Sequence, residues 1–576
     1  MPSAAMLAPP ALLAVAAILA CSLGQLAAQA GRVIGALAAW LAIGVEVAGW
    51  WWGGRVPLEF TAPISLGGVP LGLKLDSSIF ALQTVTLLAL ALLLTFQPQG
   101  SGRAALASLA GGVALSTLAA NSLALTALGL SACAGLLRVA LAWDEQEAVE
   151  AAWGTLSLAW IVLLWAAVLL EVVGGTSVYS AVPVTALQVP VFLLVAVAAL
   201  LCTGALPWRT WVSLIWARER PAGGTLALAV MVPLGFSLLL RAYALGAGEW
   251  PASWLHSLLT GLGALTALAA AGRAQAAGSV RMMRAEALPL GAGLTLMALA
   301  LGTPLGVAAA VLSLGGLGLT TGLLPSLPDE GPAGSIGDAL VFGTPPALVF
   351  GGWLLCVQAA LEAGPMTGLM GLAGALAWLV GLAAVARATW LPPPTVPRSG
   401  SLTGFAAGVG LLLAGGVGLG GLTALVAMPV ASDLMSPSSH APAIPYLGGG
   451  VAGVVAPSGN WPAGVLGGVV AAVGVALLCL AGLFRRRGWG LRQRSSEPAE
   501  ARARGHRSLP ILEVGPFLDL SWWGLPVQAA MRLRGLRLPS QYRSLVRLRA
   551  LGAATMRSRP WFWALVTVAL ALVVTR

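Results

Sequence analysis

The sequence has little charge. Only 9% of its 576 residues are Asp, Glu, Lys or Arg, against about 25% in soluble globular domains. Lys74 is the single lysine. Hydrophobic residues make up 58% of the chain, and the mean hydropathy is +0.90. This composition excludes an ordinary soluble domain and indicates a polytopic membrane protein.

Cysteine and histidine are also scarce, with five cysteines and three histidines. The cysteines stand singly inside apolar runs, without a CxxC pair or a His/Cys cluster, so neither a metal site nor a disulfide framework is indicated. No group that could ligate an iron–sulfur cluster or a flavin stands out, and we expect no redox cofactor and no metal. A membrane-embedded enzyme has no support either, because no nucleophile–base spacing is present. The cysteines are Cys21, Cys133, Cys202, Cys356 and Cys479.

Apolar runs fill nearly the whole length. Each is long enough to cross about 30 Å of hydrocarbon as a helix, and the runs are continuous rather than alternating, which excludes a barrel. The 74 glycines suit closely packed membrane helices. The sequence therefore predicts an all-α bundle of about sixteen spans. Their expected positions are 7–27, 33–52, 77–97, 103–120, 122–141, 152–175, 184–206, 224–247, 252–272, 286–303, 305–325, 337–361, 366–388, 401–428, 462–484 and 558–575.

The arginines gather on one side of this predicted topology. A net charge of +11 could suggest nucleic-acid binding, but the arginines lie in loops between spans, where the positive-inside rule places them. We therefore expect no nucleic-acid partner, a prokaryotic inner (cytoplasmic) membrane, and an external N-terminus. The first apolar run lacks a basic leader and reads as a retained helix. The arginine-bearing loops are 207–223, 273–285, 388–400 and 485–557.

The predicted organisation has three parts. Residues 1–484 form the membrane bundle, with an external hairpin at 56–76 and an external loop at 429–461. Residues 485–557 form a basic cytoplasmic or interfacial segment, in which prolines forbid one continuous helix. Residues 558–576 form a C-terminal transmembrane helix.

Four segments, in order, resemble one family of membrane proteins. They are "LGLKLDSSIFALQTVTLLALALLLTF" (71–96), "PWRTWVSLIWARERPAGGTLALAVMVPLGFSLLLRAYAL" (207–245), "SVRMMRAEALPLGAGLTLMALALGTPLGVAAAVLSL" (279–314) and "FGTPPALVFGGWLL" (342–355). They are similar to segments of the antiporter-like membrane subunits of respiratory complex I (NADH-quinone oxidoreductase), Mrp antiporters and membrane-bound (group 4) hydrogenases. The resemblance covers roughly residues 1–430.

The resemblance implies about fourteen core helices in two inverted five-helix repeats, with the C-terminal extension adding the last span. It also implies that the seventh and twelfth spans are broken, which would expose backbone groups and half-helix dipoles inside the membrane. The break positions are marked by Pro207 and Trp211, and by Gly343, Pro345 and Pro346. As partners it implies other membrane subunits of a redox-driven complex and, indirectly, a peripheral iron–sulfur, quinone or hydrogenase arm.

The family's proton-relay positions are not ionisable in this sequence. The resemblance places the glutamate of the fifth span on Leu130 and the lysine before the first break on Cys202. A later lysine falls on Thr320 or Thr321, and the residue after the second break falls on Trp353. The usual lysine relay is therefore absent.

Other ionisable residues lie in or near predicted spans, where they are functional candidates by default. Asp338 and Glu362, like several of these candidates, stand near span ends, where side chains can reach the interface. Glu171 and Glu46 lie deeper, and Glu171 could pair with Arg138. The candidates are Glu46, Arg138, Glu171, Arg241 and Glu286.

Two functions remain open. The first is a membrane-arm subunit of a complex I-like or hydrogenase-like proton-translocating assembly, either structural or with a modified proton path. The second is a stand-alone secondary transporter, such as a cation/proton antiporter or a bicarbonate-uptake component. A transporter needs a polar site in mid-membrane, and the sequence offers few candidates for one.

Overall fold

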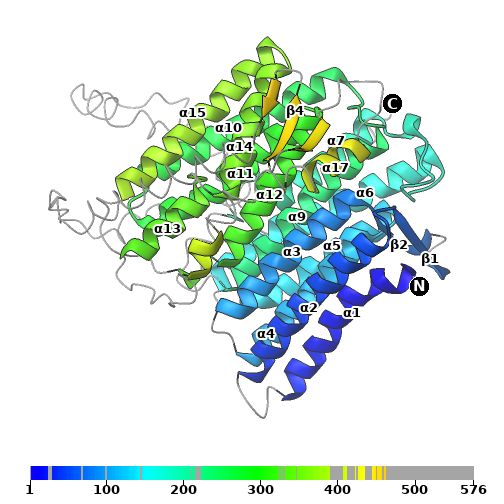
Figure 1. Ribbon diagram of the computed structural model, residues 1–576. Helices are drawn as coiled ribbons and strands as arrows, with labels where there is room; N and C mark the ends of the chain where they lie inside the picture. The colour runs from blue at the N-terminus through cyan, green and yellow to red at the C-terminus, as the bar shows by residue number, and fades with distance from the viewer. Residues whose placement is uncertain are drawn as a thin grey trace, which may run out of the picture.

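The structure is a computed structural model. It describes residues 2–23, 29–66, 69–97, 100–142, 146–208, 211–212, 215, 222–323, 326–327, 331–344, 347–388, 406–411, 422, 426–434, 444–448, 451–456 and 459–461. Ten of its helices are long and apolar enough to cross a membrane, which confirms the predicted all-α polytopic bundle (Figure 1). The predicted spans 462–484 and 558–575 and the basic segment 485–557 lie outside the described residues.

The chain begins with two antiparallel helices, a β-hairpin and a third helix. The hairpin pairs Leu58 with Leu75 and Phe60 with Leu73, so the expected hairpin at 56–76 is present. The carboxylate of Asp76 caps the next helix by accepting a bond from Ile79 N at 3.0 Å, which satisfies one of the free N–H groups at the helix start. The elements are α1 (Pro2–Leu23), α2 (Ala30–Trp52), β1 (Leu58–Leu66), β2 (Val69–Leu75) and α3 (Ser77–Phe96).

Two sets of helices follow, and each contains one interrupted member. The first set is α4 (Ser101–Ala119), α5 (Leu123–Ala142), α6 (Gln146–Gly174), α7 (Val189–Thr203) and α9 (Ala222–Leu245), with a short 3₁₀ turn at Val184–Ala186. The second set is α10 (Ser253–Ala276), α11 (Val280–Ala300), α12 (Pro304–Leu323), α13 (Gly331–Val341), α14 (Leu348–Glu362) and α15 (Pro365–Ala388).

The two ends of the bundle are distinct. We name the end that carries β1 and β2 the hairpin end, and the end with the α1–α2, α5–α6 and α10–α11 connections the arginine end. Because successive helices alternate in direction, α4 runs toward the hairpin end whereas α10 runs away from it. The fourth span of each set is interrupted, by the gap after α7 and by the gap between α13 and α14. The two sets thus match the expected pair of inverted repeats.

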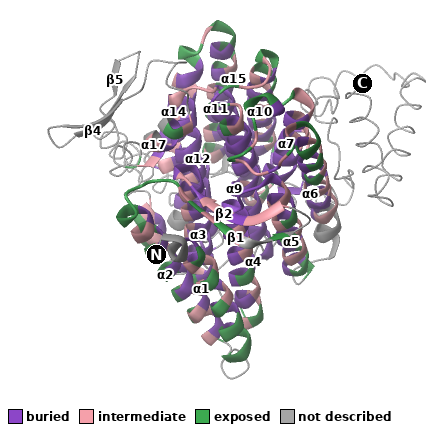
Figure 2. Ribbon diagram, turned by 90° about the vertical axis from the view of Figure 1, so that its right-hand side faces the viewer, coloured by how far each residue is buried: buried purple, intermediate pink, exposed green. Residues whose placement is uncertain are grey.

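The interior is made by helices of both sets together with α3. Helix α3 packs against α9 and α12, and α9 also packs against α12. Figure 2 shows these central helices almost wholly buried, whereas the outer faces of α1 and α2 are exposed. Large apolar side chains are exposed along one face of α15, as expected where a helix meets lipid or another membrane subunit. They are Met366, Leu369, Leu372, Leu376 and Leu379.

The region predicted to be an external loop, 429–461, contains short elements of regular structure. Helix α17 spans Met428–Leu434, and three strands, β3 (Ile444–Gly448), β4 (Val451–Ala456) and β5 (Gly459–Trp461), form an antiparallel sheet. Apolar residues in these strands favour β structure, a signal hidden in the sequence by the many prolines and glycines around them.

Candidate functional site

The first broken span ends in a left-handed glycine. Helix α7 stops at Thr203, and Gly204 follows with φ +67°, a conformation open to glycine at little cost. A Cβ at Gly204 would lie 2.2 Å from Cγ2 of Val212, so the chain after the break folds back against the glycine. Pro207 and the fully buried Trp211 follow the break. The interruption expected at Pro207 is therefore present, and the helix ends four residues before the proline.

A tryptophan closes this break. The indole N–H of Trp211 donates to the carbonyl oxygen of Leu201 at 2.9 Å, which is one of the carbonyls that a helix leaves free at its C-terminus. The hydroxyl of Thr266, on α10, accepts a bond from Leu206 N at 3.1 Å. Polar backbone groups at the break are thus occupied by the protein itself.

The second break repeats this arrangement. Helix α13 ends at Val341, and Gly343 has φ +59°. The indole N–H of Trp378 donates to the carbonyl oxygen of Phe342 at 3.2 Å. A Cβ at Gly343 would lie 2.8 Å from the ring of Trp353, so this tryptophan fills the space beside the break. Pro345 and Pro346 lie outside the described residues.

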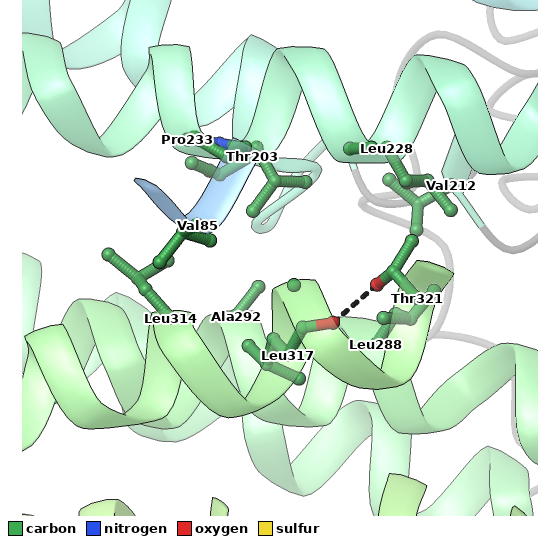
Figure 3. Close-up of a pocket in the computed structure, with 13 residues that line it drawn as sticks. Val85, Thr203, Val212, Leu228, Pro233, Leu288, Ala292, Leu314, Leu317 and Thr321 are labelled. Carbon is green, nitrogen blue, oxygen red and sulfur yellow. Dashed lines mark hydrogen bonds between the residues drawn. The ribbon is translucent and has the colours of Figure 1, made fainter. Parts of the chain in front are cut away.

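A small cavity lies between the two repeats, where a mid-membrane site would be expected. The space open to the centre of a water molecule is about 20 Å³. Figure 3 shows Thr203 and Thr321 among otherwise apolar residues from α3, α7, α9, α11 and α12. The Thr321 hydroxyl donates to the Leu317 carbonyl of its own helix at 2.6 Å, and the Thr203 hydroxyl to Leu200 at 3.4 Å. The lining residues are Val85, Thr203, Val212, Leu228, Ala229, Val232, Pro233, Leu288, Ala292, Leu314, Leu317, Gly318 and Thr321.

The positions that replace relay residues fall in different places. Thr321 lines the cavity, and Cys202, fully buried, precedes the cavity-lining Thr203. The hydroxyl of Thr320 donates to carbonyls of its own helix. Leu130 is buried in α5 away from the cavity lining, and Trp353 packs at the second break.

Two ion pairs lie toward the arginine end of the second repeat. Arg284 on α11 and Asp338 on α13 are 2% and 3% exposed, with Nε and Oδ1 2.6 Å apart. Arg284 also donates to the Gly334 carbonyl at 2.8 Å. Beside them, Nε of Arg273 lies 3.0 Å from Oε1 of Glu286.

These pairs correct three expectations. Asp338 and Glu286 do not reach out to an interface, because both are buried and paired inside the protein. Arg284 was assigned to a cytoplasmic loop, but α11 begins at Val280 and takes this arginine into the bundle. Sequence reasoning missed Arg284 because the residue that holds it is 54 positions away.

The expected pair of Glu171 and Arg138 is not formed. Arg138 lies near the end of α5 at the arginine end, with its guanidinium 4.8 Å from the ring centre of Trp153. Glu171 lies near the end of α6 at the hairpin end and is exposed. The two side chains therefore stand at opposite ends of neighbouring helices.

Arg241 is built into the hairpin end. Its guanidinium donates to the Thr126 hydroxyl at 3.1 Å and to the Leu118 carbonyl, and it lies 4.5 Å from the ring centre of Tyr179. These contacts join α9 to α4, α5 and the segment after α6. A structural role fits this arrangement.

No family model and no curated protein sequence matches the chain. Solved structures do. A chain of respiratory complex I from Thermus thermophilus with bound NADH matches with a TM-score of 0.63 and 21% identity, over 74% of this chain and 98% of that chain. A chain of the membrane-bound sulfane sulfur reductase, an archaeal respiratory membrane complex, matches with a TM-score of 0.67 and 16% identity, over 98% and 99%.

A chain of the Mrp complex from Dietzia sp. DQ12-45-1b matches with a TM-score of 0.62 and 19% identity, over 99% of this chain and 70% of that chain. At these identities the likeness establishes the fold. The chain shares the fold of these matched chains, which come from the kinds of membrane complex that the resemblance in sequence pointed to.

Proposed function

We propose that this chain is a membrane-arm subunit of a complex I-like or hydrogenase-like redox assembly, and that it passes no protons through the centre between its two repeats. The observation that carries the proposal is the cavity between the repeats, which is small and apolar where a conducting member would need ionisable groups.

The size and lining of this cavity oppose a water-filled path. A buried water needs about 10–15 Å³ of this kind of space and two to four polar partners. The cavity has room for one or two waters by volume, but its two lining hydroxyls, Thr203 and Thr321, already donate to carbonyls of their own helices. A proton in transit would therefore find few polar groups in this space.

The tryptophans at the breaks support the same conclusion. A broken helix can supply free carbonyls to an ion inside the membrane. Here the carbonyls of Leu201 and Phe342 each accept an indole N–H. At each break, one carbonyl that could serve an ion therefore accepts a hydrogen bond from the protein instead.

Membership of an assembly is supported by the solved structures with the same fold, which are chains of multi-subunit membrane complexes. The exposed leucine face of α15 offers an apolar surface that a neighbouring membrane subunit could cover. A modified proton path is the finer alternative within this function, and its candidates are the ion pairs Arg284–Asp338 and Arg273–Glu286.

The experiment is a purification of the tagged chain from its own cell's membranes in a mild detergent, with mass spectrometry of the proteins that co-elute. We expect further membrane subunits together with soluble redox subunits, and none of these from an untagged strain. A homo-oligomer without partners would overturn the proposal. It would favour the stand-alone transporter, to be tested by ion flux in proteoliposomes.

A further inference from the structure

Glu46 is an ionisable residue that is buried in the described bundle. It is 4% exposed, and neither carboxylate oxygen has a hydrogen-bond partner among the described residues. An ionised carboxylate without a partner is strongly disfavoured in an apolar interior. A protonated carboxyl avoids most of this cost. Glu46 is on α2, outside both repeats and away from the central cavity.

Glu46 lies on the buried face of α2, which contacts α3 through Trp50. Glu46 and Trp50 stand four residues apart on the buried face of α2, so one lies directly above the other. The ring of Trp50 stacks on that of Phe80 from α3, with centres 5.2 Å apart and planes at 12°. Ser77 and Thr84 flank Phe80 on the same face of α3, three residues before it and four after it.

The hydroxyls of Ser77 and Thr84 are buried and, in the part of the chain that the structure describes, also lack partners. Thr84 lies one turn inward from Phe80, as Glu46 lies one turn inward from Trp50, since α2 and α3 are antiparallel. Ser77 lies one turn outward, at the hairpin end. Three polar side chains without partners therefore follow one seam, with the Trp50–Phe80 stack between the outer one and the inner two.

The seam is closed toward the arginine end. Inward from Glu46, the buried face of α2 consists of Ala42, Ala39, Ala38 and Gly35. The Ser108 hydroxyl of α4, which donates to Ala104 of its own helix, and Leu94 of α3 lie within 3.4 Å of the position of a Cβ on Gly35. The seam is thus a blind site that can communicate with the hairpin end alone.

Other charged groups near this seam lie at its two ends. Helices α1 and α3 contain no acidic or basic residue, and Arg32 of α2 and Arg103 of α4 stand near the helix starts at the arginine end. Arg55, Lys74 and Asp76 lie at the hairpin end. At its own depth, Glu46 therefore faces no counter-ion from the helices packed against α2.

We propose that Glu46 is a proton-binding site that exchanges with the hairpin end of the bundle, with Thr84 beside the bound proton and the Trp50–Phe80 stack as its plug. The site is independent of the proposed function, because it does not connect the two sides through the centre. It gives the chain one titratable group that a neighbouring subunit or a change of conformation can charge or discharge from one face.

The test is infrared spectroscopy of the purified full-length protein in lipid nanodiscs at neutral pH. The C=O stretch of a protonated carboxylic acid shifts on exchange into D₂O. We expect such a band in the wild type and in Glu171→Gln, a matched variant of an exposed glutamate at the same end, and its loss in Glu46→Gln. A wild-type spectrum that differs from Glu46→Gln only in ionised carboxylate bands would overturn the proposal.

Exchange of the Phe80→Ala variant into D₂O tests the plug. The C=O band of Glu46 should shift at a higher rate in this variant than in the wild type. An unchanged rate would refute access from the hairpin end along this seam.

A second measurement needs no variant: dicyclohexylcarbodiimide adds to a protonated carboxyl to give an acylisourea, which rearranges without loss of atoms to a stable acylurea. We expect this adduct on the peptide between Arg32 and Arg55, and its absence would count against a protonated Glu46.

Discussion

Replacing Arg284 with methionine would leave Asp338 as an unpaired carboxylate 3% exposed inside the second repeat. Removal of one partner from a buried ion pair costs about 3–5 kcal/mol, because the remaining charge has lost its compensation. The Gly334 carbonyl would also lose a donor at 2.8 Å, which adds about 1–3 kcal/mol before relaxation. We therefore expect Arg284→Met to lower the free energy of unfolding by about 4–8 kcal/mol, the sum of the two costs before relaxation.

An exposed arginine provides the control. Arg138 is exposed and its guanidinium lies 4.8 Å from the ring centre of Trp153; such a contact contributes about 0.5–1 kcal/mol at an exposed site, so Arg138→Met should cost far less. The double variant Arg284→Met with Asp338→Leu should regain most of the loss, since apolar replacements of whole buried pairs are often neutral. Reversible unfolding in mixed micelles measures these three variants, the single variant Asp338→Leu and the wild type. Equal losses for Arg284→Met and Arg138→Met, or additive effects of the two changes in the double variant, would refute the reasoning.

Two further predictions concern the first break. Gly204→Ala should destabilise the protein by at least about 1–2 kcal/mol, the cost of a left-handed backbone for an L-residue. Gly44→Ala, in a helix with open space around its Cβ position, should be neutral or slightly stabilising in the same unfolding assay. Similar effects at both positions would contradict the observed geometry. Trp211→Phe should cost about 1–3 kcal/mol because the carbonyl of Leu201 loses its indole donor. Its amide band should also report a carbonyl that has lost a hydrogen bond, and an unchanged stability would show that the bond is dispensable.

The bundle could be predicted from the sequence because each membrane span depends only on its own run of residues. A run of apolar residues long enough to span the membrane must be helical, and Pro207 marks the first break by itself. The hairpin at 56–76 was predicted from β-favouring residues around a Gly-Gly turn, and the turn itself lies outside the described residues.

The contacts that define the interior could not be predicted. Asp338 and Arg284 are far apart in sequence, and the positive-inside rule assigns an arginine near a helix start to a loop. The role of Trp378 at the second break depends on α15 lying beside α13 and α14, which no local pattern encodes. Glu46 was a candidate by its depth alone. That its carboxylate has no hydrogen-bond partner among the described residues follows from the packing of α2 in the bundle, which the sequence does not encode locally.

The accessibility of the Cys202 thiol tests the central claim most directly. Cys202 is fully buried, and the next residue, Thr203, lines the cavity between the repeats. Native membranes would be treated with a small, water-soluble methanethiosulfonate, and peptide mapping would score the modification of Cys202 against Arg55→Cys, an exposed position near the hairpin end. We predict modification at position 55 and none at Cys202. Rapid modification of Cys202 would show that water reaches the centre of the bundle, and would contradict the proposal that no protons pass there.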